Sequence, residues 1–199
     1  QKKLYLSDPD ASILPHPDDP QEPEPEPEAV QYKRQIFFDN STRNEDLKDF
    51  PVLVHLTSTN FNFAKAQSDG HDIRFYDADD TTPLSYEIES WNPVAQEAYV
   101  WVKVPQIDKL SNTDSIWMHY GNPLRADAQA PAAVWSSDFE AVWHMDEVVG
   151  TTVSDSTGNG WDGTANANVV LNAAGQINGA DAYPDGVQGY TKLDKTGAI

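Results

Sequence analysis

Two glutamates, Glu87 and Glu89, are the acids whose spacing best suits general acid–base chemistry. In a β-strand, side chains two residues apart share a face and lie about 7 Å from one another, a separation that glycosidases also use. A glycosidase, however, holds its two acids on opposite sides of a cleft, whereas these lie side by side. The sequence therefore favours a solvated strand face here and assigns no catalytic residue.

A second group of acids lies in a polar, glycine-rich stretch at residues 155–163. It contains Asp155, Asn159 and Asp162, which together would offer oxygen ligands to a calcium ion. An EF-hand loop is excluded, because its twelfth position requires a bidentate acid and Asn166 stands there. Two interpretations remain, a looser calcium site made by these three residues and a hydrogen-bonded turn that closes a hairpin.

The other residue types that commonly carry chemistry are sparse or scattered. The chain has no Cys, which excludes disulfides, thiol nucleophiles and thiolate metal sites. The histidines show no pair at zinc-ligand spacing. His144, within the run Trp143-His144-Met145, is expected to pack as a core side chain rather than to act as a base. Arg74 shares a strand face with Asp72 and is expected to meet a carboxylate.

Three tryptophans in or near turns, Trp91, Trp135 and Trp161, are candidates for stacking on sugars. The apolar face of a pyranose ring fits an exposed aromatic ring, and sugar-binding β-sandwiches use this contact. The alternative is that these rings cover the open ends of the sandwich.

The elements that must position these residues are short β-strands. Residues 98–104 are the strongest example, because Val100, Val102 and Val104 alternate with Tyr99 and Trp101. Six or so such segments follow one another at spacings near ten residues, without a long helix. This pattern predicts an all-β fold, an antiparallel, jelly-roll-like β-sandwich, at residues 31–122.

The sequence on either side of this sandwich differs in character. Residues 1–30 hold seven of the 14 prolines and eight acids against two lysines, which predicts an extended, acidic, Pro/Glu-rich tether. Residues 123–131 are expected to link the sandwich to a second β region at residues 132–199. This region is too short for a complete sandwich, so a second, truncated one is expected there.

Charge and hydropathy exclude two classes of partner. The chain of 199 residues carries 32 acids against 13 Lys and Arg, for a net charge of −19. Such an excess repels nucleic acid phosphates. No apolar run approaches the roughly 20 residues of a membrane-spanning helix, so we expect no membrane insertion within this segment.

Seven motifs between residues 32 and 122 form a series that resembles a known family. They are Tyr32-x-Arg34, Asp49-Phe50-Pro51-Val52-Leu53-Val54, Phe61-x-Phe63-x-x-Ala66, Asp69-Gly70-x-Asp72-Ile73-Arg74-Phe75, Leu84-x-Tyr86-x-Ile88-Glu89, Trp101-Val102-x-Val104-Pro105 and Ile116-Trp117-Met118-x-Tyr120-Gly121-Asn122. The series resembles domain of unknown function 2341, found in secreted and surface proteins of bacteria and archaea.

Residues 134–199 are similar to the beginning of a LamG-like, concanavalin A-like jelly roll. The similarity rests on three stretches, residues 142–147, 155–160 and, more weakly, 179–186. The two resemblances together imply an exported, multidomain protein. In that family, the pair of domains occurs in adhesin-like surface proteins and ahead of proton channels of the TolQ, ExbB and MotA group.

The sequence thus predicts a non-catalytic, extracytoplasmic module of a bacterium or archaeon. Its expected partners are a glycan or surface polymer, or neighbouring protein subunits, and its expected roles are binding, adhesion or structural spacing. No cofactor is expected apart from the calcium alternative. Three alternatives stay open: the extracytoplasmic head of a TolQ/ExbB/MotA-like assembly, a subunit of a surface filament or pilus, and a companion to a glycoside-active domain elsewhere in a longer chain.

Overall fold

The computed structural model describes residues 31–135 and 138–193, so the predicted tether at residues 1–30 lies outside it. Twelve strands are present in the described residues, with a 3-10 turn η1 (Phe63–Lys65) and a one-turn helix α1 (Pro131–Val134). The strands are β1 (Tyr32–Phe37), β2 (Leu47–Thr57), β3 (Arg74–Tyr76), β4 (Pro83–Leu84), β5 (Tyr86–Asn92), β6 (Glu97–Ile107), β7 (Ser115–Tyr120), β8 (Thr152–Val153), β9 (Gly163–Ala165), β10 (Val170–Ala174), β11 (Gly179–Ala182) and β12 (Thr191–Leu193).

The first seven strands form a sandwich of two antiparallel sheets. Sheet I has the order β1-β7-β3-β4, and sheet II has the order β2-β6-β5. The longest pairing joins β2 to β6, from Leu47 opposite Ile107 to Thr57 opposite Glu97. The prediction of an all-β antiparallel sandwich is confirmed.

The core between the two sheets consists of alternate strand residues, as the period of two requires. Its central members are almost fully buried and come from both sheets: Ala98, Val100, Val102 and Val104 of β6, with Phe75, Ile116 and Met118 of sheet I. The predicted alternation over residues 98–104 is therefore correct, and Trp101 lies on the outer face of sheet II.

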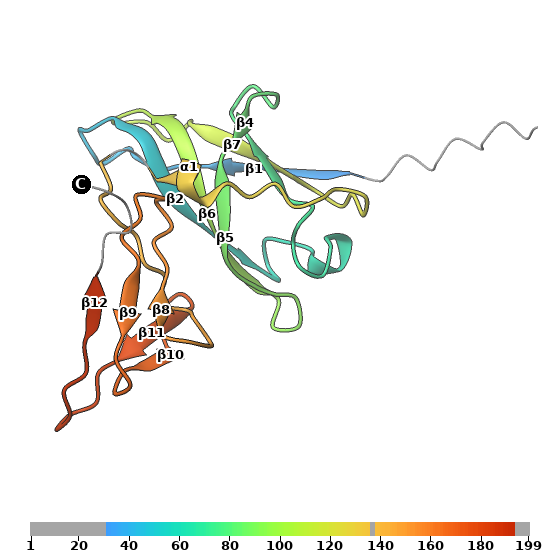
Figure 1. Ribbon diagram of the computed structural model, residues 1–199. Helices are drawn as coiled ribbons and strands as arrows, with labels where there is room; N and C mark the ends of the chain where they lie inside the picture. The colour runs from blue at the N-terminus through green and yellow to red at the C-terminus, as the bar shows by residue number, and fades with distance from the viewer. Residues whose placement is uncertain (1–30, 136–137, 194–199) are drawn as a thin grey trace, which may run out of the picture.

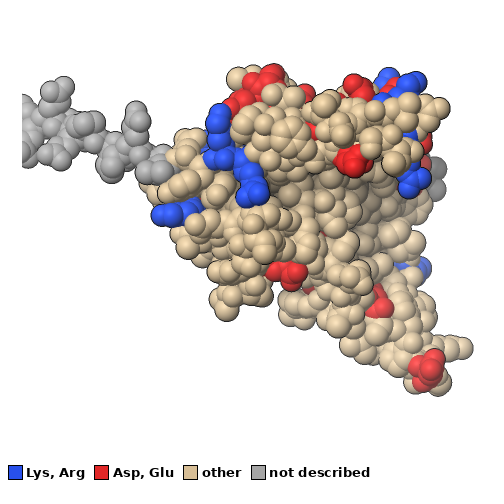
Figure 2. Space-filling view, turned by 180° about the vertical axis from the view of Figure 1, so that it is seen from behind, with Lys and Arg blue, Asp and Glu red and all other residues tan. Residues whose placement is uncertain are grey.

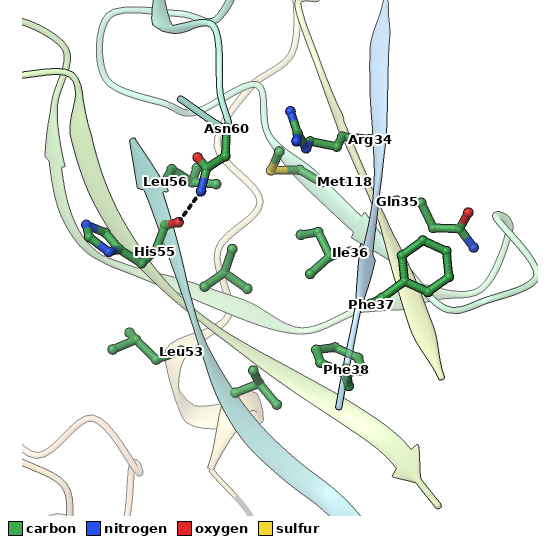
Figure 3. A pocket seen from close by; sticks show the side chains of 12 residues that line it. Arg34, Gln35, Ile36, Phe37, Phe38, Leu53, His55, Leu56, Asn60 and Met118 are labelled. Carbon is green, nitrogen blue, oxygen red and sulfur yellow. Dashed lines mark hydrogen bonds between the residues drawn. The ribbon is translucent and has the colours of Figure 1, made fainter. Parts of the chain in front are cut away.

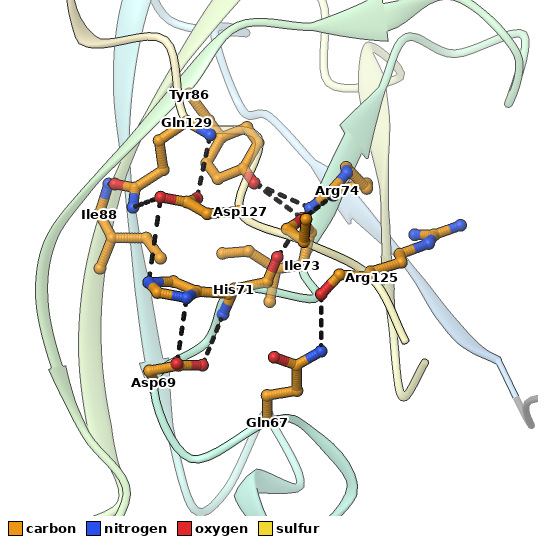
Figure 4. A network of polar contacts seen from close by, with 11 residues as sticks. Gln67, Asp69, His71, Ile73, Arg74, Tyr86, Ile88, Arg125, Asp127 and Gln129 are labelled. Carbon is orange, nitrogen blue, oxygen red and sulfur yellow. Dashed lines mark hydrogen bonds and ion pairs between the residues drawn. The ribbon is translucent and has the colours of Figure 1, made fainter. Parts of the chain in front are cut away.

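The segment predicted as a linker lies along the edge of β5 and is hydrogen-bonded to it. The Ile88 amide donates to Oε1 of Gln129 at 2.6 Å (Figure 4), and the Ala130 amide donates to the Tyr86 carbonyl at 3.0 Å. These bonds satisfy the edge of the strand as a further strand would. The connection is therefore fixed to the sandwich along its length.

Arg74 adds a second attachment for the same segment. Its guanidinium donates to the carbonyls of His71 and Ala126 and to the Tyr86 hydroxyl, at 2.9, 2.5 and 3.1 Å (Figure 4). Within the described residues these acceptors take the place of the expected carboxylate, so that expectation is wrong. The five N–H groups of arginine suit a cluster of carbonyls equally well.

Strands β8 to β12 form two small antiparallel sheets, β12-β9-β8 and β10-β11. In Figure 1 these strands, orange to red, lie together on one side of the sandwich. Asn178 joins them to sheet II, because its Nδ2 donates to the Glu89 carbonyl at 2.9 Å and to Asp146 at 3.0 Å. No helix among the described residues is both long and apolar enough to cross a membrane.

Gly70 packs against the ring of Trp91 and supplies a test of this packing. Its φ is +74°, and a Cβ at this position would lie 2.6 Å from the indole ring. We expect Gly70→Ala to lose about 1–2 kcal/mol of unfolding free energy from the left-handed backbone alone, with a further loss because Trp91 must move. Urea unfolding of the parent chain and of the variant measures the total loss of unfolding free energy.

Gly150 provides the matched control for this substitution. It has a φ of +84°, but a Cβ added there would meet nothing within 4 Å. Gly150→Ala should therefore show only the backbone cost. Equal losses in the two variants would contradict the Trp91 contact.

Candidate functional site

The outer face of sheet II is covered by residues 131–135 and 138–147, and this is where the two glutamates lie. Tyr86 points into the sandwich core, while Glu87 and Glu89 point outward. They are nonetheless only 7% and 9% exposed. The interpretation of this pair as a solvated strand face is therefore wrong, because a later part of the chain packs over it.

His144 lies between the two carboxylates. Its Nε2 is 3.2 Å from Oε2 of Glu87, and its Nδ1 contacts Oε2 of Glu89. Trp135 and Ser156 also donate to Glu87, at 3.1 and 3.0 Å. Both carboxylates thus face several donors, and the three residues form a buried ion-pair cluster, the Glu87–His144–Glu89 cluster.

The charge state of His144 follows from these contacts. Burial on its own lowers the pKa of His144, but its close contacts with Glu87 and Glu89 and their negative charges outweigh burial and raise the pKa to about 10. The imidazole is therefore protonated at neutral pH and forms ion pairs with both carboxylates. This arrangement joins two parts of the fold, because Glu87 and Glu89 belong to β5 and His144 lies about 55 residues further along the chain.

The three tryptophans predicted to stack on sugars lie in three separate places. Trp135 is buried and its ring packs against Trp101, at 5.3 Å between centroids. Trp91 packs at the end of the core against the ring of Phe61, at 5.6 Å. Trp161 lies half-buried, and its carbonyl accepts a hydrogen bond from Trp143 Nε1. The structure does not bring them onto one shared face.

The predicted calcium ligands are engaged in a hydrogen-bonded turn. Oδ1 of Asp155 accepts from the amides of Val142 and Thr157, at 3.1 and 3.0 Å, and Oδ2 accepts from the Trp161 amide at 3.1 Å. Burial alone would raise the pKa of Asp155, but these hydrogen bonds outweigh it and lower the pKa. Asp162 accepts from the amide of Asp155 itself.

Asn159, the third predicted ligand, donates its side-chain amide to the carbonyls of Phe139 and Glu140, at 3.0 and 3.1 Å. Within residues 31–135 and 138–193, no group of three or more His, Asp or Glu side chains is placed to hold a metal ion. The geometry favours the hydrogen-bonded turn, and calcium binding by these residues stays a prediction.

A polar cleft of about 350 Å³ lies at one end of the sandwich, where sequence analysis predicted no site. We call it the Arg34 cleft. It is lined by residues from four segments: Arg34 of β1, the loop residues Ser58, Thr59, Asn60, Phe61, Asn62 and Phe63, the turn residue Gln96, and Tyr120 of β7. Its lining thus combines hydroxyl, amide and guanidinium groups with an aromatic ring.

Several polar groups of the Arg34 cleft are free to meet a ligand. Within the described residues, the side chains of Arg34, Asn62 and Gln96 have no hydrogen bond or ion pair. All three are exposed. Asn60, in contrast, is already hydrogen-bonded within the fold, because its side chain accepts from the Thr57 amide and donates to the His55 carbonyl.

Basic residues gather around the same end of the sandwich. Lys65 lies 5.6 Å from the ring centre of Tyr32, and Arg125 donates to the side chain of Gln31 at 3.2 Å. In Figure 2, blue side chains cluster beside the point where the grey N-terminal trace joins the domain. An acidic chain therefore carries a local basic patch beside the Arg34 cleft.

Comparison with known proteins gives one family match. Residues 69–164 match the family described as "Domain of unknown function (DUF2341)". The match supports the resemblance seen at residues 32–122, and it continues past the expected linker into the second β region. The jelly-roll resemblance of residues 134–199 has no family match and stays a prediction. Comparison with curated proteins and with solved structures found no match.

Proposed function

We propose that the chain is an exported, non-catalytic surface module that binds an acidic glycan in the Arg34 cleft. The observation that carries this proposal is the guanidinium of Arg34, which has no ion-pair partner in the described residues and lies beside Tyr120. A guanidinium binds a carboxylate through two parallel hydrogen bonds. The ligand class is therefore a glycan that contains uronic acid.

The rest of the lining fits the neutral part of such a ligand. The side-chain amides of Asn62 and Gln96 and the hydroxyls of Ser58 and Thr59 can exchange hydrogen bonds with sugar hydroxyls. The Tyr120 ring offers an apolar surface next to them. The chain as a whole is acidic, but surface charges beyond about 8 Å are largely screened at physiological salt, so the local basic patch dominates at the cleft.

The experiment is a calorimetric titration of the full chain with an oligogalacturonate and with its neutral galactose counterpart. We expect the acidic oligosaccharide to bind. Arg34→Ala should lower its affinity by about 10- to 100-fold, since a hydrogen bond to a charged group contributes about 1.5–3 kcal/mol. Lys103→Ala, at a position outside the cleft lining, is the matched control. Equal binding of the two sugars, or unchanged binding by Arg34→Ala, would overturn the proposal.

A further inference from the structure

An apolar groove runs between β1 and β2, which are edge strands of sheets I and II in the described part of the chain. We call it the β1–β2 groove; its cavity volume is about 350 Å³. Its apolar lining comes from both sheets: Ile36, Phe38 and Met118 on one side, and Val52, Val54 and Leu56 on the other. Phe37 and Leu53 flank the groove, and their side chains point to the outer faces of the two sheets (Figure 3). The sandwich is therefore open along this side.

The two edges of the groove differ in how well they are protected. β2 contains Pro51, which has no amide to donate, and its His55 carbonyl already accepts a hydrogen bond from Asn60 Nδ2 at 2.9 Å (Figure 3). Proline and local side-chain bonds are common ways of blocking strand addition. The edge of β2 is thus a poor template for another strand.

The edge of β1 carries no such protection. The amides of Phe38 and Asn40 donate to carbonyls on the β7 side, at 2.9 and 2.8 Å. Because backbone groups alternate along an antiparallel strand, the amides of Lys33, Gln35 and Phe37 face the free edge. β1 contains no proline, and Phe37 is 62% exposed. This edge can accept an added strand.

The chain itself contains a segment that matches this edge. Residues 1–8 are free of proline, and Leu4 and Leu6 alternate there with Lys3 and Tyr5. In an extended strand the two leucines share one face, as an apolar groove requires.

We propose that residues 2–6 of one copy of the chain add as a strand to β1 of a second copy, with Leu4 and Leu6 in the β1–β2 groove. A second copy is favoured over the segment's own domain because seven prolines lie between the segment and β1, three of them in the Glu–Pro run at residues 22–28, which is separated from β1 by three residues. As a polyproline-like spacer it would extend about 22 Å, at about 3.1 Å per residue. Repetition of this head-to-tail contact links copies into an open chain.

Disulfide trapping tests the proposal directly, because the chain has no native Cys. The test variant combines Leu4→Cys with Phe38→Cys, because Phe38 points into the groove, and the matched control combines Leu4→Cys with Val149→Cys. Val149 is 81% exposed and does not line the groove. Both are oxidised under the same conditions and separated on a non-reducing gel.

We expect a ladder of covalent multimers from the test variant and none from the control. An unshifted mass with a disulfide closed inside one chain would overturn the assignment to a second copy. Absence of cross-linking, or equal ladders in both variants, would overturn the groove as the docking site. Mixing the two single variants Leu4→Cys and Phe38→Cys, one with a mass tag, must also give the mixed dimer.

Discussion

Replacing His144 with alanine should lower the free energy of unfolding by about 3–5 kcal/mol, the usual cost of removing one partner from a buried ion pair. Glu87 and Glu89 are only 7% and 9% exposed, so the substitution leaves two buried carboxylates close together. Guanidinium unfolding followed by tryptophan fluorescence measures the loss.

The matched control is His55→Ala, because His55 also pairs with a glutamate but on the surface. Its side chain is 45% exposed and its Nε2 lies 3.0 Å from Glu97. Exposed ion pairs contribute about 0–1 kcal/mol, so this variant should be nearly as stable as the parent chain. Similar losses in the two variants would mean that the Glu87–His144–Glu89 cluster does not hold the fold together.

The second large effect is a loss of stability in mildly alkaline solution. The pKa of His144 is about 10 in the folded chain, against 6.5 as the ordinary value for histidine in the unfolded chain. A raised pKa means that the folded state holds a proton which the unfolded state releases. The stabilisation is therefore complete below pH 6.5 and is lost as the pH rises through 10.

Between pH 7 and pH 9 this difference of one proton predicts a decline of about 1.4 kcal/mol per pH unit. Unfolding curves at four or five values across that interval give the slope. His144→Gln should remove the slope, because glutamine has no proton to lose. A parent chain equally stable at pH 7 and pH 9 would contradict the assigned charge state.

The sandwich could be predicted from the sequence because its signal is local. Val100, Val102 and Val104 alternate with Tyr99 and Trp101 within one strand, and the buried face follows from that alternation. The covering of the outer face could not be predicted in this way, because the residues that cover Glu87 and Glu89 lie about 50 residues further along. Trp101 was the available signal: a large ring on the same face as two acids indicates that the face is covered.

The Arg34 cleft could not be predicted from the sequence for a different reason. Arg34, Asn62, Gln96 and Tyr120 come from four separate segments, and none belongs to a motif with functional spacing. The pairing of β1 with β7, the turn between β5 and β6 and the loop that follows β2 bring them together. For Trp91 and Trp135 the sequence leaves two interpretations open, stacking on sugars and covering the ends of the sandwich, and the folded chain packs other rings against both.

Nuclear magnetic resonance of the full chain during titration with an oligogalacturonate tests the central claim most directly. The account predicts that the Arg34 Nε–H signal and the amides of residues 58–62 and of Gln96 shift together and saturate at one concentration. The indole signals of Trp91, Trp135 and Trp161 should stay in place. Shifts centred on those indoles, or an unchanged Arg34 signal at saturating sugar, would contradict binding in the Arg34 cleft.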